Sequence, residues 1–177
     1  MNDELTDRIK KISMLLCDVD GVLTRGGIIL GSGGQEFKQF DVQDGMGITL
    51  ARQGGLKTGV ITGRESEAVI QRAKELQFDL ISQGKNDKLQ VLDEIISDFT
   101  ITYENVCYIG DDLLDMAVMK KAGVSAAPAN ARREVKEISD IITENQGGGG
   151  AVRELVEIIL KTQNKWQDIV NKYWEDR

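Results

Sequence analysis

The sequence contains no histidine, and this absence excludes several common kinds of active site. Ser-His-Asp and Cys-His catalysis both need an imidazole, as does a zinc site with histidine ligands. Only two cysteines are present, Cys17 and Cys107, each within an apolar segment typical of a strand. We expect buried free thiols there, because structural disulfides are rare in cytoplasmic proteins. Acid–base chemistry must therefore depend mainly on carboxylates.

Long apolar runs are also lacking. None approaches the roughly 18 residues that a membrane span needs, and the charged start MNDELTDRIKK does not resemble a secretory signal. We therefore expect a cytoplasmic protein with no membrane partner. The net charge of -7 argues against nucleic acid as a partner. It leaves room for a small phosphorylated substrate, since a metal ion can reverse the local field.

Short apolar runs alternate with amphipathic segments, which predicts an α/β fold. Strands are expected at 13–17, 57–61, 79–82, 106–109, 124–126 and, more weakly, 138–142. Helices are expected at 45–53, 65–76, 88–97, 113–121 and 151–161, with Asp44 and Asn86 as N-caps. This alternation predicts a Rossmann-like, three-layer parallel sheet in a single domain spanning 1–177, with a core at about 12–160.

Two segments depart from the alternation. Residues 27–30 and 35–41 flank the tight turn Gly31–Gly34, which predicts an inserted β-hairpin. The tail 161–177 places Trp166, Ile169, Val170 and Tyr173 on one helical face. Little sequence remains for a cap domain.

Asp18 and Asp20 directly follow the first predicted strand. On an extended chain, residues i and i+2 point the same way, so the two carboxylates are expected to converge. They would repel unless a cation or a proton came between them. This favours a Mg²⁺ site with one carboxylate free to attack, although Asp and Gly are also ordinary turn residues.

A second acidic cluster follows another strand. It contains Asp111 and Asp112, and then Asp115 one helical turn later. Oxygen ligands without histidine or cysteine suit Mg²⁺. Asp115 is placed to orient the metal ligands without binding the metal itself. Asp112 either shares this role or is simply a helix cap.

Two further segments suit an anion. Thr62-Gly63-Arg64 ends a strand, and a hydroxyl with backbone N–H groups at a helix N-terminus can bind phosphate. Lys88 enters another helix. The alternatives are an ordinary threonine cap and a surface lysine.

Taken together, the order DxDG, T-G, K, GDDxxD resembles the haloacid dehalogenase superfamily of phosphohydrolases over about residues 12–160. The resemblance implies that Asp18 attacks phosphorus and that Asp20 is the acid and then the base. It also implies that Mg²⁺ is held by the Asp18 carboxylate, the Asp20 backbone carbonyl and Asp111. Thr62 and Lys88 would bind the phosphate.

In lacking a cap domain, the chain resembles the capless subclass of this superfamily. Members of that subclass often oligomerise, and this resemblance implies a homotetramer in which the hairpins join the subunits. A closer resemblance is to the 3-deoxy-D-manno-octulosonate 8-phosphate phosphatase family of lipopolysaccharide biosynthesis. The segments that carry it are DVDGVLT (18–24), FxxxDG (40–45), ITGR (61–64), QGKNDKL (83–89), IGDDLLD (109–115) and GGGGAVRE (147–154).

This closer resemblance implies a small phosphorylated sugar acid as substrate. It also implies that Gly147, Gly148, Gly149 and Gly150 close over the active site of a neighbouring subunit, the alternative being a flexible linker. Arg64 and Arg153 are candidates for binding the sugar carboxylate. Arg25 departs from the family, which often has an acidic residue there.

Three other functions remain open at this point. A phosphatase of a nine-carbon, sialic-acid-type 9-phosphate would share every motif. A promiscuous housekeeping phosphatase needs no selective cap. A non-catalytic oligomerisation module is the remaining alternative, and the retention of every acidic motif residue argues against it.

Overall fold

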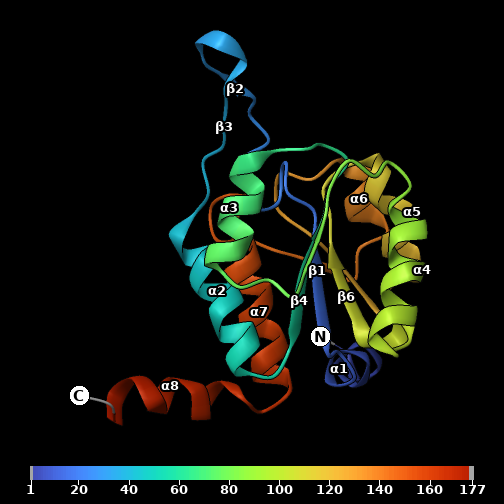
Figure 1. Cartoon of the computed structure of the whole chain (residues 1–177). Helices are drawn as coiled ribbons and strands as arrows, with labels where there is room; N and C mark the ends of the chain where they lie inside the picture. The colour runs from blue at the N-terminus through green and yellow to red at the C-terminus, as the bar shows by residue number, and fades with distance from the viewer. Residues whose placement is uncertain (1, 176–177) are drawn as a thin grey trace.

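Within residues 2–175, the part of the chain that the computed structural model describes, a six-stranded parallel sheet forms the centre (Figure 1). The strand order is β5-β4-β1-β6-β7-β8. Their bounds are Met14–Cys17 (β1), Lys57–Ile61 (β4), Leu80–Ser82 (β5), Val106–Ile109 (β6), Val124–Ala127 (β7) and Ile141–Ile142 (β8). Because β1 lies between β4 and β6, the carboxyl ends of these three strands meet at the middle of one edge.

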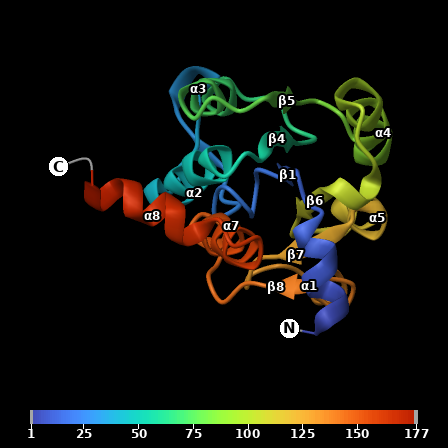
Figure 2. The same cartoon turned by 90° about the horizontal axis from the view of Figure 1, so that it is seen from below.

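Helices cover both faces of the sheet and complete three layers (Figure 2). One face packs against α1 (Asp3–Lys10), α2 (Val42–Gln53), α3 (Glu67–Glu75) and α7 (Ala151–Thr162). The other packs against α4 (Lys88–Phe99), α5 (Met116–Lys121) and α6 (Arg133–Glu137). Alternation along β1 sends Leu15 and Cys17 into the first core and Met14 and Leu16 into the second. The predicted α/β class and its layers are confirmed.

Several helix boundaries differ from the prediction. Asp44 is not an N-cap, since Asp41 caps α2 by accepting hydrogen bonds from the backbone N–H groups of Gln43 and Asp44. Asp87, not Asn86, caps α4. The segment predicted as one helix at 113–121 is a 3-10 helix, η3 (Leu113–Asp115), followed by α5. The helices α1 and α6 were not predicted, because they are short and mostly charged.

The predicted hairpin is present but short. It contains β2 (Ile29–Leu30), the turn η1 (Ser32–Gly34) and β3 (Glu36–Phe37), which pair antiparallel and project from the body (Figure 1). No cap domain is inserted elsewhere in residues 2–175. The hairpin leaves Ile28, Ile29, Leu30 and Phe37 largely exposed.

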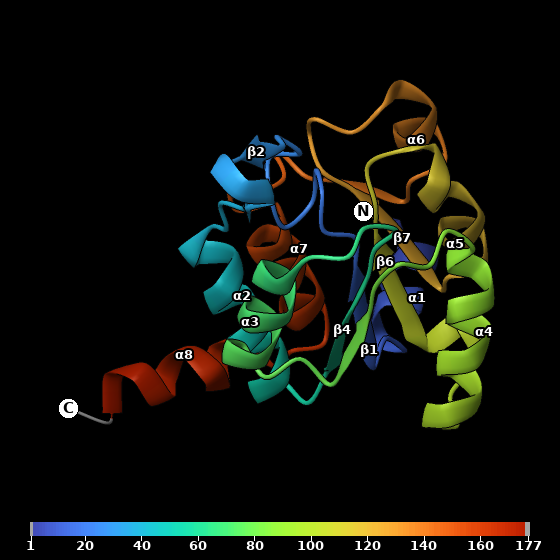
Figure 3. The ribbon, with the colours of Figure 1, turned by 45° about the horizontal axis from the view of Figure 1, so that its top comes forward.

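The tail forms a helix, α8 (Trp166–Glu175), as its apolar face predicted. Ile169 is buried against the core and Trp166 packs partly against it, while the C-terminal end of α8 extends away from the body (Figures 1 and 3). Both cysteines are buried free thiols, as expected. None of the described helices is long and apolar enough to cross a membrane.

Candidate active site

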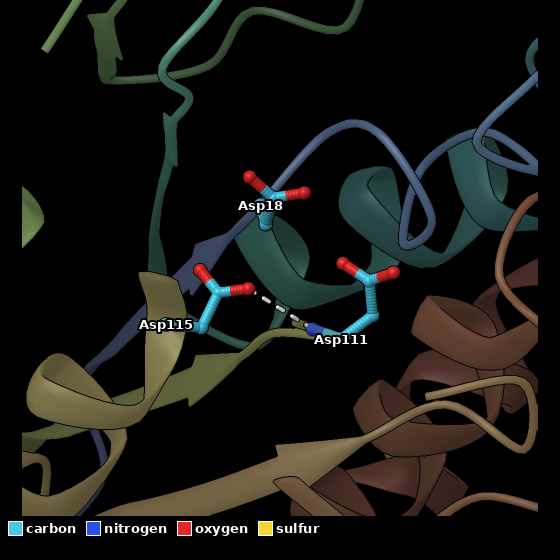
Figure 4. Close-up of side chains that lie close together, drawn as sticks. All are labelled: Asp18, Asp111 and Asp115. Carbon is cyan, nitrogen blue, oxygen red and sulfur yellow. Dashed lines mark hydrogen bonds between the residues drawn. The ribbon is translucent and has the colours of Figure 1, made fainter. Parts of the chain in front are cut away.

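Three aspartate side chains come together at the carboxyl ends of the central strands (Figure 4). Asp18 follows β1 directly, Asp111 follows β6 after one glycine, and Asp115 ends η3. One carboxylate oxygen from each lies within 4.8 Å of the other two. The parallel pairing of β1 with β6, which sets Cys17 beside Ile109, brings these distant segments to one place. The structure thus unites the two acidic motifs.

A buried lysine links two of these carboxylates. The Nζ atom of Lys88, the first residue of α4, lies 2.5 Å from Asp18 Oδ1 and 2.6 Å from Asp115 Oδ1. Burial lowers the pKa of Lys88, but the adjacent carboxylates outweigh this effect and hold its pKa above the ordinary value. Lys88 is therefore ionised at neutral pH. The alternative of a surface lysine is wrong, since its side chain is only 4% exposed.

Asp115 has no free oxygen to offer a ligand. Its Oδ1 atom accepts hydrogen bonds from Lys88 and, at 2.6 Å, from the hydroxyl of the fully buried Tyr108. Its Oδ2 atom accepts from the backbone N–H groups of Asp111 (3.0 Å) and Asp112 (3.3 Å). Asp115 thus orients the Asp111 segment and Lys88, which supports its predicted role behind the ligands.

The carboxylates of Asp18 and Asp111 lie close to other negative charges, and the positive charge of Lys88 offsets only part of the cost of their burial. Burial raises the pKa of Asp18 to about 6, because Lys88 offsets only part of the cost and Asp115 adds to it. Burial together with Asp18 and Asp115 raises the pKa of Asp111 to about 7. A divalent cation that prefers hard oxygen ligands would remove this repulsion. The residues therefore fit Mg²⁺.

The glycine of the DxDG motif makes room for this arrangement. Gly21 has φ +103, a backbone conformation that other residues rarely adopt. A Cβ atom at this position would lie 2.0 Å from Asp111 Oδ2. Only glycine allows Asp111 to approach the loop after β1.

The carboxylates of Asp18 and Asp20 pair with different lysines, Lys88 and Lys38, and their predicted convergence stays a prediction. The chain bends after Asp18, because the carbonyl of Val19 accepts backbone hydrogen bonds from Val22 and Leu23 and the extended-strand rule no longer applies. Asp20 pairs with Lys38 and lies outside the group formed by the other aspartates. A role for its backbone carbonyl in holding metal stays a prediction.

Thr62, Gly63 and Arg64 lie at the end of β4, at the same edge of the sheet as the three grouped aspartates. They do not lie at a helix N-terminus as predicted, because α3 begins only at Glu67. The backbone N–H of Ser66, which precedes α3, donates a hydrogen bond to the side chain of Gln83. Thr62 is buried, and its hydroxyl accepts a 3.4 Å hydrogen bond from the N–H of Arg64. An anion here would meet the hydroxyl and loop N–H groups without a helix dipole.

Two predicted site residues are occupied elsewhere. Asp112 is exposed and caps η3 by accepting a 2.7 Å hydrogen bond from Leu113, so the helix-cap interpretation is the one that the structure favours. Arg153 pairs with Glu157 at 2.8 Å and lies over the ring of Trp166 on α8. It is not brought to the aspartate group. Arg25 is exposed.

The Gly147–Gly150 run packs against its own chain. A Cβ atom on Gly147 would lie 1.8 Å from the carbonyl oxygen of Gly21, and Gly148 donates a backbone hydrogen bond to Val22. These glycines are needed for close approach to the DxDG loop within one subunit. These contacts exclude a loose linker, and closure over a neighbouring subunit's active site stays a prediction.

Sequence reasoning missed four residues that organise the site. Tyr108 carries the only hydroxyl in the apolar run of β6, a signal that was available. Asn130 joins the DxDG loop to the Gly-rich run, donating to the carbonyl of Gly21 at 3.0 Å and accepting from Gly147 at 2.6 Å. Glu36 and Lys38 are the other two; their alternation with Phe37 indicates that they share a face of the hairpin, but not where that face docks.

Comparison with known proteins agrees with this geometry. Residues 79–155 match the family described as haloacid dehalogenase-like hydrolase. The chain is 39% identical to the 3-deoxy-D-manno-octulosonate 8-phosphate phosphatase of Escherichia coli over 158 residues, which is 89% of this chain and 84% of that protein. Identity to the Yersinia pestis enzyme is also 39%, over 92% of this chain and 87% of that one.

The chain belongs to this phosphatase family. A crystal structure of the family's Moraxella catarrhalis member superposes with a TM-score of 0.95 at 40% identity, covering 98% of this chain and 99% of that one. That structure is a complex with a magnesium ion, a phosphate ion and a KDO molecule. The capless, hairpin-bearing architecture is therefore that of the 3-deoxy-D-manno-octulosonate 8-phosphate phosphatases.

Proposed function

We propose that this chain is a Mg²⁺-dependent phosphatase that hydrolyses 3-deoxy-D-manno-octulosonate 8-phosphate to the free sugar acid and phosphate. The observation that carries the proposal is the grouping of Asp18, Asp111, Asp115 and Lys88 at one sheet edge, in a family member. This grouping supplies a nucleophile, metal ligands and a buried cation within one small volume.

Asp18 is the proposed nucleophile. Its carboxylate is held by Lys88 through Oδ1, which leaves Oδ2 to attack phosphorus and form an aspartyl-phosphate. Asp20 gives a proton to the departing oxygen of the sugar, and it later takes a proton from the water that hydrolyses the intermediate. Lys88, ionised and buried, stabilises negative charge on the transferring phosphoryl group. Thr62 donates its hydroxyl to another phosphate oxygen.

Asp18 and Asp111 are the side chains that would hold Mg²⁺, with Asp115 orienting the Asp111 segment. The ion would neutralise phosphate oxygens and reduce the repulsion between phosphate and nucleophile.

The substrate carries a carboxylate besides the phosphate. Arg64 is exposed beside Asp20, and its planar fork suits a carboxylate. The exposed apolar side chains of the hairpin support the further proposal of a homotetramer, in which hairpins cover one another and neighbouring subunits cover the open sites.

A phosphate-release assay with Mg²⁺ tests the proposal. The eight-carbon sugar acid 8-phosphate, a nine-carbon sugar acid 9-phosphate and p-nitrophenyl phosphate are compared at equal enzyme concentration. We expect the highest kcat/KM for the eight-carbon substrate. A higher kcat/KM for the nine-carbon acid would identify the chain as a phosphatase of nine-carbon sugar acid 9-phosphates instead. Equal values for all three substrates would indicate a promiscuous phosphatase.

A further inference from the structure

A buried lysine reaches the active site from the projecting hairpin. The side chain of Lys38, just after β3, is only 3% exposed, although its neighbour Phe37 is 53% exposed. Its ammonium group forms an ion pair with Asp20 Oδ1 and another, at 3.2 Å, with Glu36 Oε1. The hairpin is therefore connected to the acid–base residue and is not only an exposed surface.

Glu36 holds this lysine and also Arg64. Glu36 Oε2 lies 2.5 Å from the guanidinium of Arg64, whose Nε atom lies 3.8 Å from Asp20 Oδ2. Two carboxylates and two cations thus form a closed, electrically balanced group. The hydrogen bond from Arg64 and the ion pair with Lys38 lower the pKa of Glu36, which keeps it ionised and able to hold both cations.

The two oxygens of Asp20 have different surroundings. Oδ1 is occupied by Lys38, whereas Oδ2 is buried and has no hydrogen-bond partner among the described residues. A buried carboxylate oxygen without a partner is costly, which suggests that it has one during the reaction. With Lys38 at Oδ1, Oδ2 is the oxygen left free to meet the reacting oxygens.

We propose that Lys38, held by Glu36, is a positioning residue that fixes the Asp20 carboxylate with Oδ2 directed at the reacting oxygens. The inference rests on the proposed phosphatase function. In the first step the proton leaves Asp20 Oδ2 for the sugar oxygen as its bond to phosphorus breaks and the bond from Asp18 to phosphorus forms. In the second, water attacks phosphorus, the bond to Asp18 breaks, and a water proton passes to Asp20 Oδ2.

The test exploits the need for that first proton. An alkoxide leaving group must be protonated, whereas p-nitrophenolate leaves as a stable anion, and kcat/KM reports this first step. In Lys38→Met we expect kcat/KM to fall at least about tenfold more for the sugar acid 8-phosphate than for p-nitrophenyl phosphate. Lys57→Met, which removes a surface lysine paired with Asp79, is the matched control and should leave both values unchanged.

A purely structural role for Lys38 predicts a different result. If Lys38 only tethers the hairpin, both substrates lose kcat/KM in equal proportion, and this outcome, or no loss at all, overturns the inference. If circular dichroism shows that Lys38→Met does not fold, Glu36→Gln is tested instead. This variant keeps Lys38 but holds it less firmly, so the ratio of kcat/KM for the sugar acid 8-phosphate to that for p-nitrophenyl phosphate should still fall about threefold. An unchanged ratio there overturns the inference.

A wrong substrate assignment can be distinguished from a failure of the inference about Lys38. If the native protein hydrolyses a simple primary-alkyl phosphate but not the sugar acid, the same ratio is measured with that phosphate and the inference stands or falls on it. A native protein that releases phosphate from none of these compounds overturns both the proposed function and the inference.

Discussion

The ammonium of Lys88 lies 2.5 Å from Oδ1 of Asp18, in a site where both side chains are less than a tenth exposed. Burial alone would favour the neutral form of both groups, but Asp18 and Asp115 raise the pKa of Lys88, and Lys88 offsets part of the effect of burial on the pKa of Asp18. In the proposed mechanism the pair holds one oxygen of Asp18 and leaves the other to attack phosphorus. It also places the positive charge of Lys88 beside the proposed nucleophile, where that mechanism needs it.

Asp18→Asn should lower kcat by at least about three orders of magnitude while the protein stays folded. The amide can still accept a hydrogen bond from Lys88, but it cannot form an aspartyl-phosphate. Phosphate release measures the loss, and circular dichroism checks the fold. Asp98→Asn, an equivalent change on the exposed face of α4, is the control and should keep native activity. Activity of more than a few per cent in Asp18→Asn, with contamination excluded, would contradict covalent catalysis.

Activity should disappear in excess chelator and return with Mg²⁺. The carboxylates of Asp18 and Asp111 repel each other without a cation, and carboxylate oxygens suit a hard ion. Asp111→Asn should raise the Mg²⁺ concentration needed for half-maximal activity about tenfold or more. Full activity in chelator, or an unchanged Mg²⁺ requirement in the variant, would remove the metal from the mechanism.

Gly147→Ala should reduce both activity and stability. The added methyl would lie 1.8 Å from the carbonyl of Gly21, so the DxDG loop or the Gly-rich run must move. Such overpacking costs about 1–3 kcal/mol. Gly149→Ala is the matched control, because its Cβ would meet only the carbonyl of Gln146, at 3.3 Å. Thermal unfolding and kcat should separate the two variants, and equal behaviour would mean that the close approach does not matter.

The limits of sequence reasoning are visible in Asp18, Lys38 and Asp44. Asp18 was predictable because a buried parallel strand fixes where its carboxyl end lies. Lys38 was not, because the periodicity of a hairpin says which residues share a face but not where that face docks. Asp44 was expected to cap its own helix. Its carboxylate instead accepts hydrogen bonds from the N–H groups of Gly150 and Arg153, at the start of α7. That contact depends on packing between helices far apart in sequence.

Particle mass in solution should be about four times 19.6 kDa. Four apolar side chains of the hairpin are exposed, and burial of such side chains against a neighbour is favourable. Ile29→Asp should lower the mass measured by light scattering. Ile142→Asp is the matched control, since Ile142 on β8 is also 50% exposed, and it should leave the mass unchanged. A native monomer at micromolar concentration would contradict the tetramer.

Away from the active site, Asp140, just before β8, links α1 to β7. It accepts two 2.7 Å hydrogen bonds from the guanidinium of Arg8, and two more from the N–H (2.8 Å) and hydroxyl (2.9 Å) of Ser125 on β7. Burial raises the pKa of Asp140, but these hydrogen bonds outweigh it, so its pKa lies below the ordinary value. The ionised form therefore favours the folded state.

Asp140→Asn should lower the free energy of unfolding by about 1–2 kcal/mol at pH 7, since charge-assisted hydrogen bonds are lost and partial exposure of Arg8 limits their strength. The folded-state pKa is below the unfolded value of about 4, so the contribution is complete above that pH and disappears as the pH falls through the folded-state pKa. Urea unfolding between pH 7 and pH 3.5 should show the native and variant curves converging. Asp7→Asn, which removes an aspartate that is 72% exposed, should change stability little at any pH. A difference that stays constant down to pH 3.5 would mean that the charge of Asp140 does not stabilise the fold.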